Sequence, residues 1–169
     1  IAERAGVSVG SVYQYFPNKD AILIALARQH IDEAQQRLGA LIVQVRRSPQ
    51  PVAVILRRLV DAVVAEHDED EALHRAMFRR TPPSAALQQQ LREVDAALVS
   101  QVAELLEAMP QVQVADRQCA AYLAVQTVDL LVHGYLLDPP AQPSREAFLA
   151  GLVDMLTAYL TAAPGDAVP

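Results

Sequence analysis

The chain has 169 residues and a net charge of −6, with 52% hydrophobic residues, no tryptophan and one cysteine. That length fits one or two compact domains with a substantial core, and the dominance of Ala, Leu and Val among the apolar residues favours helices. No apolar run reaches the roughly 18 residues that span a bilayer and no secretory signal pattern opens the chain, so we expect a cytoplasmic protein without membrane contact. The single cysteine, Cys119, excludes an internal disulfide, and we interpret it as a small buried hydrophobic side chain.

The charge is unevenly distributed along the chain. Residues 1–50 carry six Lys/Arg and four Asp/Glu, a net charge of +2, whereas residues 51–169 carry a net charge of −8. A nucleic acid would therefore dock on the first part of the chain, with the acidic remainder pointing away from it. The chain also starts inside a helical pattern at Ile1, and we expect a further N-terminal segment before it.

Helical signals begin at the first residue. Residues 1–5 have the pattern of a helix end, with Gly6 in the C′ position that favours glycine. Ser8 is a good N-cap for a second helix that continues to Phe16. On this helix Val12 and Phe16 lie four residues apart and are predicted to face the core.

A long helix is predicted from about Lys19 to Arg47, with Asn18 as its N-cap and an apolar stripe at helical spacing. The expected later helices run from Pro51 to about Glu66, Asp68 to Arg79, Ser84 to Met109, Asp116 to about Leu137 and Ser144 to about Leu160. No strand pattern interrupts this series. The sequence therefore predicts an all-α fold, in which a long helix joins a partial N-terminal helix-turn-helix to a larger helical domain.

The short helix after Ser8 has the composition of a DNA-recognition helix. Such a helix enters the major groove with its N-terminal side chains against base edges. We predict base contacts for Val9, Ser11 and Gln14, since an amide suits adenine and a valine suits the thymine methyl group. The predicted phosphate contacts are Ser8, Tyr13, Tyr15 and Lys19, and Gly10 allows close approach of the backbone.

The stretch AERAGVSVGSVYQYFPNKDAIL (residues 2–23) resembles the helix-turn-helix motif of the TetR (tetracycline repressor) family of bacterial transcriptional regulators. The resemblance covers about the first 25 residues, and the later helices agree only in number, length and order. It implies a DNA-binding domain over residues 1–30, an effector-binding and dimerisation domain over 31–163 and a tail over 164–169. The family's first helix precedes this motif and is absent from the sequence, so the DNA-binding domain is expected to be incomplete.

Palindromic operators are bound by dimers, so the larger domain is expected to dimerise. Its last two helices carry more apolar surface than one small domain readily covers, although part of both stripes is intrachain core. The resemblance implies a four-helix bundle built from two such helices of each subunit. The predicted interface residues are Val125, Val128, Val132, Leu136, Phe148, Leu152, Met155, Leu156 and Tyr159.

The resemblance also implies a small-molecule pocket in the larger domain. Tyr122, Gln126, Asp129 and His133 recur at three- and four-residue steps and form a polar stripe on an otherwise apolar helix. This stripe lines a pocket, forms a polar seam of the dimer, or holds an Asp129–His133 pair, and the sequence does not separate these alternatives. The remaining predicted pocket residues are Leu59, Val63, Met77, Phe78, Leu98 and Val102.

The preferred function is therefore a bacterial, nucleoid-associated DNA-binding regulator, a repressor that a small, largely apolar effector releases from a palindromic operator. No cofactor or metal is expected. Glu71 and His74 form a Glu-x-x-His pattern, but a di-iron site needs a second copy, and Asp68 with Glu71 is better interpreted as a capping box. No nucleophile–base set or phosphate-binding loop indicates an enzyme. The alternative function is a dimeric helical ligand-binding module with a non-functional DNA-binding segment.

Overall fold

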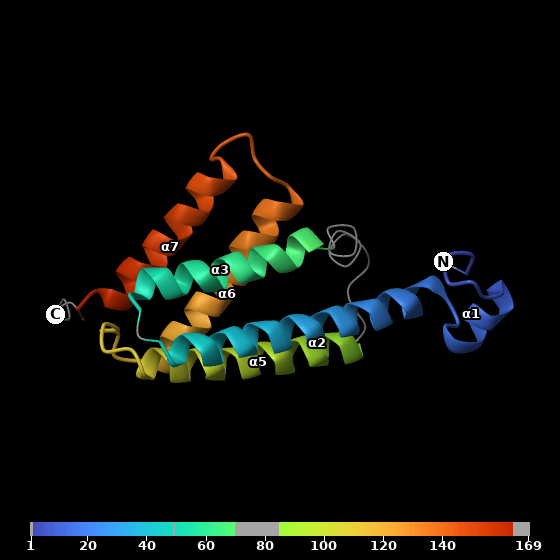
Figure 1. Ribbon diagram of the computed structural model, residues 1–169, viewed down its shortest axis with the longest axis horizontal. Helices are drawn as coiled ribbons and strands as arrows, with labels where there is room; N and C mark the ends of the chain where they lie inside the picture. Colours follow the sequence, from blue (N-terminus) through green and yellow to red (C-terminus); the bar gives the residue numbers. More distant parts are fainter. Residues whose placement is uncertain (1, 49, 70–84, 164–169) are drawn as a thin grey trace.

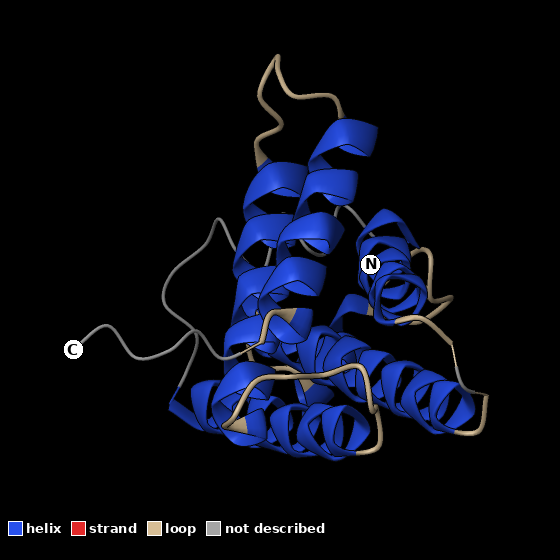
Figure 2. Ribbon diagram, turned by 90° about the vertical axis from the view of Figure 1, so that its left-hand side faces the viewer, coloured by secondary structure: helices blue, strands red, loops and turns tan. Residues whose placement is uncertain are grey.

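The computed structural model describes residues 2–48, 50–69 and 85–163, and every regular element within these ranges is an α-helix (Figure 2). The helices are α1 (Val9–Tyr15), α2 (Lys19–Arg46), α3 (Val52–Glu69), α5 (Ala85–Glu107), α6 (Arg117–Leu137) and α7 (Arg145–Thr161). The predicted all-α fold is confirmed, and the expected ends of these helices hold to within three residues. Most of the helix predicted from Asp68 to Arg79 lies outside the described residues.

Four helices begin at the side-chain caps that the sequence predicts. Ser8 Oγ accepts the backbone N–H of Ser11 at 3.0 Å, and Asn18 Oδ1 accepts that of Ala21 at 2.8 Å. The later caps are Asp116, which accepts from Cys119 at 2.8 Å, and Ser144, which accepts from Ala147 at 3.3 Å. Each cap satisfies a backbone donor that the first turn of a helix leaves without an intrahelical partner.

The predicted helix end before α1 is also present. The N–H of Gly6 donates to the carbonyl of Glu3 at 3.2 Å, and the N–H of Val7 donates to that of Ala2 at 3.1 Å. These two bonds form a Schellman motif, which needs a left-handed residue at its C′ position. Gly6 fills that position with a φ of 66°. The glycine therefore sets the turn that leads into α1.

Helix α2 forms the long axis of the molecule, with α1 at one of its ends (Figure 1). Helix α5 packs against both α2 and α6, while α3 packs against α7, α2 and α6. The C-terminal part of α2 thus packs against α5 and α3, and together with α6 and α7 these helices form the helical body. Because α2 is continuous from Lys19 to Arg46, no flexible linker separates this body from the N-terminal segment, residues 1–30.

The main core lies between α2, α3, α5, α6 and α7. Its largest fully buried side chains are Ile42, Val45, Val60, Val132 and Leu160. Ala27 and Ile31 of α2 form a second, smaller cluster with Ile24 and with Leu91 and Val94 of α5. The predicted apolar stripe of α2 is therefore confirmed, and its N-terminal part packs against Leu91 and Val94 of α5.

Two local interpretations of the sequence are wrong. Asp68 does not start a new helix, because it lies inside α3 and its carboxylate accepts from Arg145 Nη2 of α7 at 2.5 Å. Cys119 is exposed rather than buried. It lies in the first turn of α6, where the helix period directs its side chain away from the buried face formed by Ala120, Ala121 and Ala124.

Helix α6 is the one described helix that is long and apolar enough to cross a membrane by length and composition, with a mean hydropathy of 1.3. This qualifies the expectation that no such segment exists. The same composition is found in core helices of soluble proteins, and α6 packs against α5, α3 and α7. Asp129 and His133 also lie within it, and ionisable groups are costly in a bilayer.

Candidate DNA-binding helix and polar cluster

Helix α1 is short, and its start is held by a pair of serine hydroxyls. The Oγ atoms of Ser8 and Ser11 lie 2.8 Å apart, in addition to the backbone cap that Ser8 provides. A seven-residue helix is marginal without tertiary support, and none of the residues of α1 is buried. The cap is therefore a large part of what holds the helix in shape.

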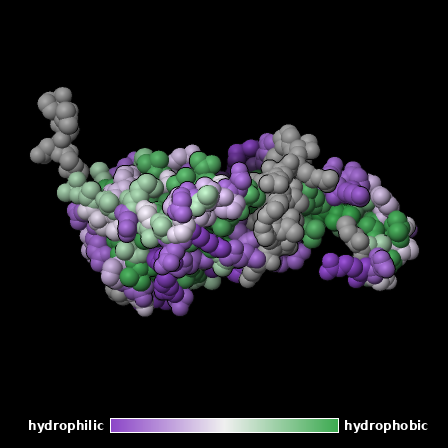
Figure 3. Space-filling view, turned by 90° about the horizontal axis from the view of Figure 1, so that it is seen from above, coloured by the Kyte–Doolittle hydropathy of each residue, from purple (hydrophilic) through white to green (hydrophobic). Residues whose placement is uncertain are grey.

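All of the predicted DNA contacts lie on the accessible surface of this segment. Val9, Tyr13 and Tyr15 are 63%, 55% and 80% exposed, and apolar surface is visible at this end of the molecule in Figure 3. The others are Ser8, Gly10, Gln14 and Lys19, which are exposed, and Ser11, which is half-buried. Their side chains are thus available to a DNA duplex, although contact with DNA stays a prediction.

The predicted inward face of α1 is only half covered. Val12 and Phe16 are half-buried, so the expectation that they face a closed core is only partly met. The backbone N–H of Phe16 donates to the carbonyl of Val12 at 2.9 Å and closes the last turn. Among the described helices, α1 has few contacts with the helical body, so α2 alone sets its position.

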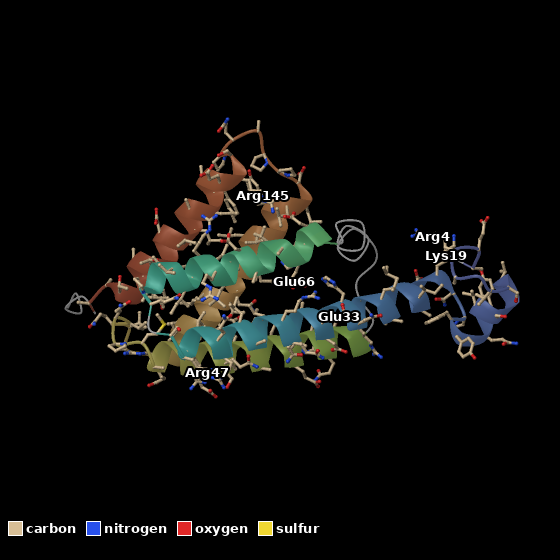
Figure 4. All side chains as sticks on the ribbon, in the orientation of Figure 1. Arg4, Lys19, Glu33, Arg47, Glu66 and Arg145 are labelled. Atoms are coloured by element: carbon tan, nitrogen blue, oxygen red, sulfur yellow. The ribbon has the colours of Figure 1, made fainter. Side chains whose placement is uncertain are left out.

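Two basic side chains mark the same end of the molecule (Figure 4). Lys19 and Arg4 both lie there, whereas Arg47 lies at the far end of α2. Sequence reasoning does not single out Arg4, although its charge within the weakly basic segment was the available signal. Cations at this position can bind backbone phosphates without reading the sequence.

The predicted effector residues fall into two groups. Leu59, Val63, Leu98 and Val102 are partly buried and pack against the main core. Gln126 and His133 are half-buried, whereas Tyr122 and Asp129 are exposed. Met77 and Phe78 lie outside the described residues, as do Glu71 and His74 of the metal alternative. Within the described ranges, no group of three or more His, Cys, Asp and Glu side chains is arranged to hold a metal ion.

The polar stripe of α6 contains an Asp129–His133 pair, one of the three predicted alternatives. Nδ1 of His133 lies 3.0 Å from Oδ1 of Asp129 and 2.7 Å from its backbone oxygen. Burial alone would lower the pKa of His133, but the hydrogen bonds and charge of Asp129 outweigh it and raise that pKa. The pair therefore favours the imidazolium form.

Two residues of other helices contact this stripe: His67 of α3 contacts His133, and Asp95 of α5 contacts Gln126. The rings of His67 and His133 meet edge to face, with centroids 4.0 Å apart. His67 is 6% exposed and is the buried polar side chain of the described core. Burial raises the pKa of the Asp95 carboxyl and the charge of Asp129 raises it further, while a hydrogen bond with Gln126 opposes both. No pattern in the sequence links these residues, because they lie on three helices.

The predicted dimer interface needs correction. Val132, Leu152 and Leu156 are 0%, 4% and 3% exposed, so they belong to the intrachain core and cannot contact a partner. Val125, Val128, Leu136 and Phe148 are partly buried against that core. Of the predicted residues, Met155 and Tyr159 remain exposed, at 49% and 39%. Heptad-like apolar spacing finds the buried face of a helix but does not say whether its own chain or a partner covers it.

The apolar surface that is exposed on α6 lies on a different face. Tyr122, Leu123, Leu130 and Leu131 are 55%, 43%, 72% and 38% exposed. On the helix these residues lie away from Ala121 and Val132, which are fully buried. Such a group of large apolar side chains on one helix is typical of an interaction surface.

Comparison with known proteins agrees with this architecture. A family model described as the tetracyclin repressor-like C-terminal domain matches residues 51–160, and a model of bacterial regulatory proteins of the tetR family matches residues 1–26. The chain is 28% identical over 68 residues to the "Fatty acid metabolism regulator protein" of Bacillus subtilis (strain 168), an alignment that spans 40% of this chain and 35% of that protein.

A solved structure described as the fatty acid degradation regulator FadR from Bacillus halodurans has a TM-score of 0.61 and 22% identity, and the match covers 96% of this chain and 86% of that one. At this identity the likeness shows the fold alone. The family models match the two parts of the molecule separately, with the helix-turn-helix in the first and the helical body in the second. The chain therefore belongs to the TetR family of bacterial transcriptional regulators.

Proposed function

We propose that the protein is a repressor that binds a palindromic operator as a homodimer and leaves it when a small, largely apolar effector binds. The observation that carries this proposal is the capped helix α1, which exposes the predicted DNA contacts at the end of a continuous α2. The domain division proposed from the sequence is kept, with DNA binding in residues 1–30, effector binding and dimerisation in residues 31–163, and a tail in residues 164–169. Association with the nucleoid would follow from operator binding.

The proposed dimer uses the exposed apolar surfaces of α6 and α7. Leu130 has the largest exposed fraction of the four on α6, and Met155 and Tyr159 are the exposed large apolar side chains of α7. A second copy is the proposed occupant, because a two-fold dimer presents two α1 helices to half-sites about 34–36 Å apart or a multiple of that distance. Covering these side chains would also remove a large apolar surface from water.

The proposed effector is a fatty acid or a molecule derived from one. The name printed for the curated relative refers to fatty acid metabolism and that of the structural neighbour to fatty acid degradation. Leu59, Val63, Leu98 and Val102 offer an apolar lining beside the core, and the polar stripe of α6 offers groups that orient a polar end. Whether these residues line one pocket stays part of the proposal.

Effector binding would act on DNA through α2. The side chains of α5 contact α2 at Ala27 and Ile31, at the end of the N-terminal segment. A ligand that favours one position of α5 would therefore tilt α2 and change the spacing of the two α1 helices. Such a ligand alters operator affinity only by as much as its affinity differs between the two arrangements.

DNA binding should be tested first without an effector. Labelled DNA from upstream of the protein's own gene is titrated with protein at several salt concentrations. We expect Lys19→Gln to weaken binding to all sequences and to reduce the salt dependence, and Gln14→Ala to change the sequence preference. Arg92→Gln, at an exposed cation of α5, is the matched control and should leave binding unchanged. Equal effects of the Lys19 and Arg92 variants would contradict the proposed interface.

A second experiment separates the proposal from its alternative, a dimeric ligand-binding module with a non-functional DNA-binding segment. A long-chain fatty acid is added to the protein–DNA complex, and its binding to the DNA-free protein is measured by calorimetry. The repressor proposal requires sequence-specific DNA binding and its loss on fatty acid addition. Fatty acid binding without sequence-specific DNA binding would instead support the alternative.

A further inference from the structure

We propose that His67 and His133 form a proton-sensitive contact between α3 and α6, which holds one positive charge and opens when it takes up a second. The contact is internal to the helical body. It shares Asp129 and His133 with the polar stripe that is proposed to orient an effector, but the proton coupling requires no bound effector. It rests on the position of two imidazoles against each other and on the charged groups that surround them.

Hydrogen bonds at Nδ1 determine where the protons of the two imidazole rings lie. Nδ1 of His67 is 2.7 Å from the backbone oxygen of Val63, and Nδ1 of His133 contacts two oxygens of Asp129. Carbonyl and carboxylate oxygens only accept hydrogen bonds, so Nδ1 carries a hydrogen in both rings. Any further proton must therefore bind at Nε2, which turns either ring into an imidazolium.

The groups around the two rings determine which ring is protonated first. Asp129 stabilises the cationic form of His133 and raises its pKa against the effect of burial. Burial lowers the pKa of His67, and the neighbouring His133 lowers it further; the Val63 carbonyl opposes this shift. Since the ring centroids are 4.0 Å apart, a charge on one ring opposes a charge on the other. The first proton thus belongs to His133, and the second must enter a buried ring beside a cation.

Charged and titratable groups on the neighbouring helices also act on the two histidines. His30 of α2 also lowers the pKa of His67, whereas the charge of Asp129 raises it. The charge of Asp95 on α5 favours the cation on His133. On either side of His67, Glu66 is paired with Arg37 of α2 and Asp68 with Arg145 of α7.

These charges make the contact two-state. With one proton, the charges of Asp129 and Asp95 stabilise the imidazolium of His133, which lies against the neutral ring of His67. With two protons, two cations would be held edge to face inside the body, with His30 nearby. Separation of α3 from α6 relieves this repulsion and lets water reach His67. A charged imidazole is more stable in contact with water than buried beside a second cation.

The pair is also placed where such a movement reaches the N-terminal segment. His30 precedes Ile31, which belongs to the small apolar cluster that joins α2 to α5. Asp95 follows Val94 of the same cluster. Displacement at the histidine pair therefore acts on the part of α2 that carries α1. This last link rests on the proposed function, whereas the proton coupling itself does not.

The test uses the whole chain without DNA, so that its result is independent of the proposed function. The pKa values of the assigned histidines are measured from their Cε1–H signals by NMR, for the natural protein and for His133→Gln and Asp129→Asn. We expect His133 to titrate above 6.5 and His67 below it. His133→Gln should move the pKa of His67 upward, and Asp129→Asn should move that of His133 downward.

Asp61→Asn is the matched control, because Asp61 pairs with Arg57 four residues away on α3, as Asp129 does with His133 on α6. It should leave both histidine titrations unchanged. Two histidines that titrate independently, or an unchanged His67 after His133→Gln, would overturn the proposal. Whether the two histidines titrate independently is measured on the natural protein alone, so this outcome does not depend on the folding of a variant.

Opening is measured separately by amide hydrogen exchange, corrected for the intrinsic effect of pH. Amides in the last turns of α3 and in the middle of α6 should lose protection when the pH is lowered from about 6.5 to about 5, because the lowered pKa of His67 means that the second proton binds only below the ordinary pKa of histidine. His67→Gln should remove this loss, since it cannot take up the proton. Equal protection at both pH values in the natural protein would refute the opening even if the two titrations are coupled.

Discussion

The cap of α1 can be tested by a single atom change, Ser8→Ala. Ser8 Oγ accepts the N–H of Ser11 at 3.0 Å and lies 2.8 Å from the Ser11 hydroxyl. Loss of a serine N-cap costs about 1 kcal/mol, within a range of roughly 0.5–2 kcal/mol. Since α1 has seven residues and none of them is buried, little else opposes its unfolding.

The magnitude follows from this free energy. About 1 kcal/mol changes an equilibrium constant roughly fivefold, so the ratio of helical to frayed α1 should fall by about that factor. If DNA binds only the form in which α1 is helical, the apparent affinity of the protein for DNA falls in proportion to the population of that form. The fall reaches the full factor once the frayed form predominates. We therefore expect a loss of protection at residues 9–15 and a DNA affinity lowered by up to about fivefold.

Two further variants serve as controls for the loss of the cap. Ser8→Thr keeps both the acceptor and the donor and should preserve helix protection and DNA binding. Ser144→Ala removes the equivalent cap of α7 and should lower the stability of the body without changing protection of α1. The assays are amide exchange on the DNA-free protein and a titration with DNA from upstream of its gene. Unchanged protection of α1 in Ser8→Ala would refute the argument, as would equal losses of DNA affinity in the Ser8 and Ser144 variants.

Three other outcomes are expected. Leu130→Glu, at a side chain that is 72% exposed, should shift a dimer to monomer in sedimentation velocity. The control Leu26→Glu, at a side chain of α2 that is 47% exposed, should not, and equal behaviour of the two variants would contradict the proposed interface. Ile42→Ala, at a side chain that is 2% exposed, should lower the free energy of unfolding in urea by about 2–5 kcal/mol, whereas Val43→Ala at 49% exposure should change it by much less. The free energy of unfolding should peak near pH 6.5. The raised pKa of His133 stabilises the folded state, and this contribution is lost as the pH rises from 6.5 through that pKa. The lowered pKa of His67 destabilises the folded state as the pH falls below 6.5. His133→Gln should remove the decline on the alkaline side and His67→Gln the decline on the acidic side, and a monotonic profile between about pH 5 and 8 in the natural protein would contradict the two opposed shifts.

Local features of this protein could be predicted because they depend on neighbours in the chain. The caps at Ser8, Asn18, Asp116 and Ser144 are each set by a side chain three residues before the N–H that it accepts. Gly6 is required because its φ is positive. The spacing of apolar residues also predicts which face of α2 is buried, including Ala27 and Ile42.

Predictions about the surfaces of α6 and α7 were less successful. Periodicity marks Val132 and Leu152 as apolar and inward, but it does not distinguish the core of one chain from the interface of two. Helix α6 is apolar on nearly all sides, so its exposed face, which includes Leu130, cannot be separated from its buried face by hydropathy. The burial of a side chain depends on which helices surround it, and that is a property of the tertiary structure.

The sequence by itself determined the helices, their caps, the family and the residues that α1 exposes, because these follow from contacts within a few residues and from a compact motif. Only the tertiary structure decided that His67 of α3 meets His133 of α6, with Asp95 of α5 beside them. These residues are separated by long stretches of chain, and their charges interact only because three helices pack around one another. Whether a polar residue serves as a surface group or as part of a coupled charge cluster depends on that packing and on the loss of water that accompanies it.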